Sequence, residues 1–126
     1  MLGIDYPVYE IDGKKLVVRQ SFAAQILMQR RGIDPGNLND FVGPGKPQSA
    51  ENWVKIFGCM VAENFTDPTR PDVDLNTAPS TDYWLMRIDP YEMGAITDVC
   101  NSAFLKAAEA RRTKLAIVLP NQGQAS

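Results

Sequence analysis

The strongest periodicity of apolar residues along the chain lies in residues 49–64. Large apolar side chains recur there at intervals of three and four, which places them on one face of an α-helix. They are Trp53, Ile56, Phe57, Met60 and Val61. Ser49 suits the start of this segment because a Ser hydroxyl can cap free backbone N–H groups. The pattern predicts an amphipathic helix over residues 49–64.

A shorter helix is predicted over residues 21–31. Ser21 can cap its first turn, and Gly32 and Pro35 follow its end, as is usual at a helix C-terminus. One side of this helix carries Phe22, Ala23, Ile26, Leu27 and Arg30.

The last helix is predicted over residues 90–112. Asp89 can cap it, and Pro90 at the first helical position loses no needed hydrogen bond. The expected inner stripe consists of Met93, Ile96, Val99, Cys100, Ala103, Phe104 and Ala107. Gly94 disfavours a helix by about 1 kcal/mol relative to Ala, so we expect close packing at this position.

The N-terminal part reads as a β-hairpin over residues 6–19. Residues 6–11 and 14–19 are rich in strand-forming side chains, and Asp12 and Gly13 between them form a favoured two-residue turn. Since a two-stranded hairpin is marginally stable alone, another part of the chain must cover it.

The remaining segments are loops or short elements. Residues 32–48 and 65–80 are rich in Gly, Pro or acidic residues and predict surface loops. Residues 83–88 fit either a helical turn or a short strand, and we favour a short helix. The apolar residues 115–119 predict a strand or a docking segment, and residues 120–126 predict a flexible tail.

At 126 residues the chain has the usual length of one domain. We therefore expect one compact domain over residues 1–119. Its predicted class is mainly α (α+β), a hairpin followed by a small bundle of three to four helices. Because residues 1–5 lack the basic start of a signal peptide and no long apolar stretch follows, we expect a cytoplasmic protein without a membrane partner.

Charge is unevenly distributed. The formal net charge is -2 and the isoelectric point about 5.0, which does not favour nucleic-acid binding. Residues 63–82 hold five acids and one base, whereas residues 106–114 hold four bases and one acid. One interpretation is solvated surface, with bases placed favourably at a helix C-terminus. The other is docking between opposite patches, in a possible homo-oligomer or with a partner.

The residues that usually carry catalysis are scarce. There is no histidine, which removes the commonest general base and metal ligand. Residues 43–47 resemble a phosphate-binding loop but lack the hydroxyl residue after Lys46. Residues 72–83 begin like a calcium loop, but Thr77 and Tyr83 replace the required Gly and Glu. We therefore predict a protein that is not an enzyme, with no catalytic, cofactor or metal site.

Residues 9–24 carry a more specific pattern. An Asp-Gly-Lys turn is followed by apolar residues and then by Arg19, Gln20, Ser21 and Phe22. This segment resembles the opening of tail assembly chaperones of long-tailed (siphovirus-type) bacteriophages and prophages, in which such a hairpin leads into a first helix. The resemblance implies a protein that binds the long, apolar, helical tape measure protein before tail tube assembly, and that also helps recruit tail tube protein. It implies no catalytic residue.

Binding a client helix requires an uncovered apolar surface, which we expect between the helices at 49–64 and 90–112. The candidate partner-binding residues are Trp53, Phe57, Tyr83, Trp84 and Leu115, although the same residues could form the core. Two alternatives stay open. One is another virion or prophage structural part, such as a head–tail connector or tail completion protein. The other is a small ligand-binding or enzyme domain without histidine.

Overall fold

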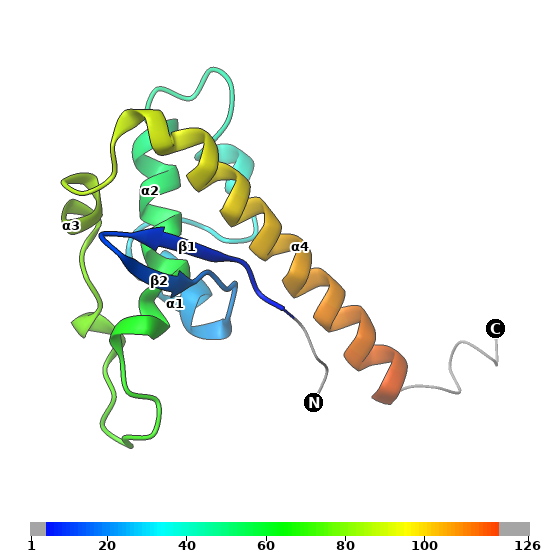
Figure 1. The fold of residues 1–126 in the computed structure, drawn as a ribbon. Coiled ribbons are helices and arrows are strands. Elements are labelled where there is room, and N and C mark those ends of the chain that lie inside the picture. The colour runs from blue at the N-terminus through cyan, green and yellow to red at the C-terminus, as the bar shows by residue number, and fades with distance from the viewer. Residues whose placement is uncertain (1–4, 119–126) are drawn as a thin grey trace.

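The computed structural model describes the backbone of residues 5–118 and the side chains of residues 5–113. A hairpin is followed by helices, so the predicted class, mainly α with an N-terminal hairpin, is confirmed (Figure 1). The described strands and α-helices are β1 (Val8–Ile11), β2 (Lys14–Val17), α1 (Phe22–Arg30), α2 (Ser49–Met60), α3 (Thr81–Leu85) and α4 (Met93–Val118). Short 3-10 turns are η1 (Leu38–Asp40), η2 (Ala62–Phe65), η3 (Leu75–Thr77) and η4 (Pro90–Glu92).

The hairpin forms as its turn residues predict. Asp12 and Gly13 have positive φ angles of 52° and 76°, which suit the tight turn between antiparallel strands. Val8 pairs with Val17 across the strands, and both are exposed. Leu16 on the opposite face is fully buried. The body of the protein therefore covers one face of the hairpin.

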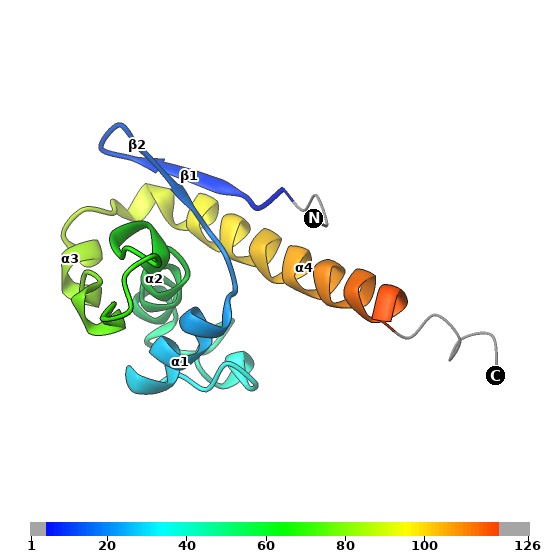
Figure 2. The same cartoon turned by 90° about the horizontal axis from the view of Figure 1, so that it is seen from below.

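Helix α2 lies at the centre of the molecule and contacts α1, α3 and α4 (Figures 1 and 2). Its predicted apolar face is buried except at Trp53, which is partly buried, and Phe57 lies at the middle of an aromatic group. The Phe57 ring meets those of Tyr9 and Trp84 edge-on, with centroids 5.6 and 5.4 Å away. Burying side chains of this size supplies the largest favourable term of folding.

Three predicted helix boundaries move by more than one residue. The last α-helix begins at Met93, and residues 90–92 before it form the 3-10 turn η4. Helix α2 ends at Met60, and residues 62–65 continue as the 3-10 turn η2 rather than as α-helix. Helix α4 continues to Val118, so residues 115–118 are helical and the strand considered for 115–119 is wrong. The last of these, Leu119, and the predicted tail 120–126 lie outside the described residues. The short helix favoured over a strand for 83–88 is present as α3, although it spans Thr81–Leu85 and residues 86–88 lie outside it.

The expected close packing at Gly94 is wrong. Gly94 is exposed, and a Cβ built there would meet nothing within 4 Å. The close approach occurs instead at Gly58 in α2, where a Cβ would lie 2.8 Å from Cδ1 of Trp84. Gly58 is therefore the glycine that tertiary packing requires.

The N-terminal half of α4 packs on α2 and β1, and its C-terminal half extends past them (Figures 1 and 2). Its inner stripe is buried as predicted at Ile96, Cys100 and Ala103. Among the described side chains of α4, Ala103 is the last buried one. Within residues 5–118, no helix has the length and apolar character needed to cross a membrane.

Candidate functional site

The predicted partner-binding residues lie mostly inside the protein. Phe57 is 0% and Trp84 1% exposed, which contradicts a contact with a partner, because packing against the core already covers both rings. Trp53 and Tyr83 are partly buried and pack against the same core. The side chain of Leu115 lies outside the described part. These aromatic residues therefore follow the other interpretation, that of core.

Other large apolar side chains are uncovered. The exposed ones in the described part of the chain are Val8, Val17, Phe22, Val73, Leu85, Met86, Tyr91 and Leu105. Four of them are more than two thirds exposed: Phe22 (77%), Met86 (86%), Tyr91 (85%) and Leu105 (70%). None of them is among the residues that the sequence predicted for partner contact. The exposure of Leu105 could have been predicted from the sequence, because this residue falls opposite the inner stripe of its helix.

The sequence placed Phe22 on the same side of the first helix as Leu27, yet Leu27 is buried and Phe22 is exposed. The buried residues of α1 are Ala24, Leu27 and Met28. Phe22 is the first residue of α1, so no preceding turn of this helix covers its ring. Its backbone is nevertheless well fixed, since Ser21 accepts a hydrogen bond from the Ala24 N–H at 3.0 Å. The exposed ring is thus carried on a rigid helix start.

The segment before Phe22 is held to the core from both sides. Val18 is fully buried, and the N–H of Arg19 donates to the Met60 carbonyl at 3.0 Å. The Arg19 guanidinium lies 3.4 Å from Glu63 and 5.3 Å from the centre of the Tyr6 ring. Gly13, Val18 and Ser21 therefore have structural roles in the segment 9–24. Phe22 is the large apolar residue there that packing leaves most exposed.

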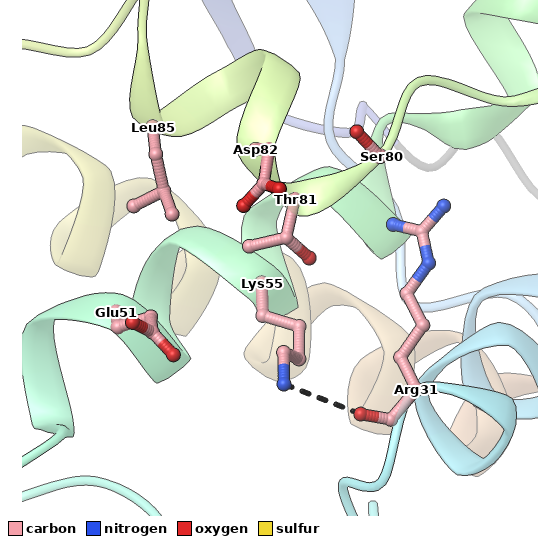
Figure 3. A pocket seen from close by; sticks show the side chains of 7 residues that line it. All are labelled: Arg31, Glu51, Lys55, Ser80, Thr81, Asp82 and Leu85. Atoms are coloured by element: carbon pink, nitrogen blue, oxygen red, sulfur yellow. Dashed lines mark hydrogen bonds between the residues drawn. The ribbon is translucent and has the colours of Figure 1, made fainter.

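A separate cavity of about 370 Å³ opens between α2 and α3 (Figure 3). It is lined by Arg31, Glu51, Lys55, Ser80, Thr81, Asp82 and Leu85. The Lys55 ammonium donates to the Arg31 carbonyl at 3.3 Å, and Nη2 of Arg31 donates to the Pro79 carbonyl at 3.0 Å. The first bond joins α2 to the end of α1, and the second joins the end of α1 to the loop before α3. The Lys55 ammonium and Nη2 of Arg31 are thus engaged in holding the fold together, whereas Nη1 of Arg31 is buried without a hydrogen-bond partner among the described residues.

The two cysteines, Cys59 and Cys100, are free and buried. Burial raises the pKa of Cys59 from 9.0 to about 11, although the nearby Arg31 acts in the opposite direction. Burial also raises the pKa of Cys100. Both thiols are therefore protonated at neutral pH and are poor nucleophiles. Within the residues that the structure describes, no group of three or more His, Cys, Asp or Glu side chains is placed to hold a metal ion.

Comparisons of the chain with known protein families, curated proteins and solved structures find no significant match.

Proposed function

We propose that this chain is a tail assembly chaperone of a long-tailed bacteriophage or prophage. It acts without catalysis in the host cytoplasm, where it binds the tape measure protein and assists assembly of the tail tube. The proposal is supported by the pattern in residues 9–24 together with the exposure of Phe22 within it.

The physical argument starts from what the fold needs. Within residues 9–24, the turn glycine, the buried Val18 and the capping Ser21 are explained by folding alone. Phe22 is 77% exposed and therefore contributes little to the stability of the folded chain. A large apolar ring held on a rigid helix start is suited to bind an apolar client helix, because little conformational entropy is lost on binding.

Covering the ring fully would contribute roughly 1.5–3 kcal/mol. Such an energy corresponds to about a tenfold to a hundredfold change in affinity. The apolar stripe of the client helix would aggregate in water if it stayed uncovered. Because the contact with Phe22 covers part of this stripe, binding keeps the client soluble.

The test is co-expression with the tape measure protein encoded by the same genome, followed by measurement of soluble client and of client captured on the tagged chain. We expect the wild-type chain to keep the client soluble. The Phe22→Ser variant should capture at most about a tenth as much, given the affinity change above.

Met86→Ser is the matched control, because Met86 is 86% exposed and lies outside the segment 9–24. It should behave as the wild type, and both variants should unfold at the wild-type denaturant concentration. A client that is equally insoluble with and without the wild-type chain contradicts the proposed function. Equal capture by Phe22→Ser and the wild type contradicts the role of Phe22.

A further inference from the structure

One face of α4 carries a second regular pattern, directed away from the body. Six residues at alternating intervals of four and three are all exposed, and we call them the outer stripe. They are Gly94, Asp98, Asn101, Leu105, Ala108 and Arg112. This spacing is the seven-residue repeat with which helices pair side by side. Its central apolar residue, Leu105, is 70% exposed.

The charges of the outer stripe are arranged symmetrically about Leu105. Asp98 lies seven residues before it and Arg112 seven residues after it, about 10.5 Å away on each side at 1.5 Å per residue. Between Met93 and Leu105, Asp98 is the sole charged residue of the sequence. Residues 106–113 hold three bases and one acid. The two halves of α4 therefore carry opposite charge.

This symmetry identifies one occupant for the stripe, namely a second copy of the same helix. In an antiparallel pair, a two-fold axis through Leu105 brings it against the partner's Leu105. The same operation places Asp98 against the partner's Arg112, and Arg112 against the partner's Asp98. A parallel pair would oppose like charges at both positions and is disfavoured. Gly94 and Ala108 lack bulky side chains and allow the axes to approach closely.

We propose that α4 mediates a two-fold symmetric dimer of this chain through the outer stripe, with the helices antiparallel and crossing at Leu105. The contact is isologous, so it closes with two copies and does not build a ring. A single helix pair lies at the small end of protein interfaces, and a reversible dimer is expected. The inference does not depend on the proposed function.

The test is sedimentation equilibrium of the full chain from micromolar to near-millimolar concentration at low salt. We expect a monomer–dimer equilibrium for the wild type. Asp98→Arg should weaken it by about tenfold or more, because two ion pairs become two repulsions by symmetry. Arg112→Asp should do the same. The double variant, with both substitutions, should return to within a few-fold of the wild type.

Leu105→Ser should also weaken the dimer, whereas Met86→Ser, at a residue that is also more than two thirds exposed, should not. Circular dichroism of each variant checks that helix content is unchanged. A wild-type chain that stays monomeric throughout, a closed assembly of more than two copies, or a double variant as weak as either single one would each overturn the proposal.

Discussion

The side-chain amide of Asn64 forms both hydrogen bonds that a neighbouring strand would make to Val17. Its Oδ1 accepts from the Val17 N–H at 3.1 Å, and its Nδ2 donates to the Val17 carbonyl at 2.9 Å. Asn64 lies in η2, directly after α2, and Val17 ends β2. This amide therefore joins the hairpin to the central helix and covers part of the outer edge of β2.

We expect Asn64→Ala to lower the free energy of unfolding by about 1–2 kcal/mol, as is typical for the loss of a pair of partly exposed hydrogen bonds. Urea unfolding measures the change. Asn64→Asp is the matched control, since it keeps an acceptor for the Val17 N–H but cannot donate to the Val17 carbonyl. It should fall between the wild type and Asn64→Ala. A wild-type midpoint for Asn64→Ala would show that these two hydrogen bonds do not stabilise the fold.

Gly58 is tightly packed and Gly94 is open, so alanine at these two positions should change the stability of the fold in opposite directions. Gly58→Ala places a methyl group 2.8 Å from Cδ1 of the buried Trp84 and should cost about 1–3 kcal/mol. Gly94→Ala meets no atom within 4 Å and should stabilise α4 by roughly 0.5–1 kcal/mol. Thermal unfolding at a concentration where the chain is monomeric compares them. Similar unfolding temperatures for the two variants would contradict the packing described at Gly58.

The pH dependence follows from the buried thiol of Cys59. Its pKa is raised from 9.0 in the unfolded chain to about 11 in the fold, chiefly by burial. A raised pKa means that the unfolded state loses the proton first, so the stabilisation is complete below pH 9 and is lost as pH rises from 9 towards 11. Denaturant unfolding across this range should show falling stability for the wild type.

Cys59→Ala provides the control for this effect. Its stability should fall less steeply over the same range, because one group that titrates differently in the two states is gone. Burial also raises the pKa of Cys100, and burial with the hydrogen bond to Glu92 raises the pKa of Tyr9, and both act in the same direction. The slope should therefore be reduced but not abolished. Parallel curves for the wild type and Cys59→Ala would contradict the assignment to Cys59.

Local chemistry along the sequence was enough to predict most elements. The turn at Asp12 and Gly13 needs only residues that accept positive φ angles. The start of α1 needs only the Ser21 cap, and the inner face of α2 needs only apolar residues at helical spacing. These features depend on interactions between residues a few positions apart, which a sequence displays directly.

The candidate site was harder to predict because exposure depends on contacts between distant residues. Trp84 and Phe57 are of residue types that are common at binding surfaces. Although 27 positions separate them in the sequence, they cover each other in the fold, with 5.4 Å between the ring centres. Phe22 was grouped with Leu27 on one side of its helix, yet only Leu27 is buried. Periodicity predicts which residues share a face, but not how much of that face a neighbouring element reaches.

By itself, the sequence determined the hairpin, the main helices and the absence of histidine, since these follow from local spacing and composition. Only the tertiary structure decided which aromatic rings are covered, that Gly58 rather than Gly94 is tightly packed, and that the outer stripe of α4 faces away from the body. The reason is that each of these depends on where another element comes to lie. The free energy that decides it is summed over many long-range apolar contacts.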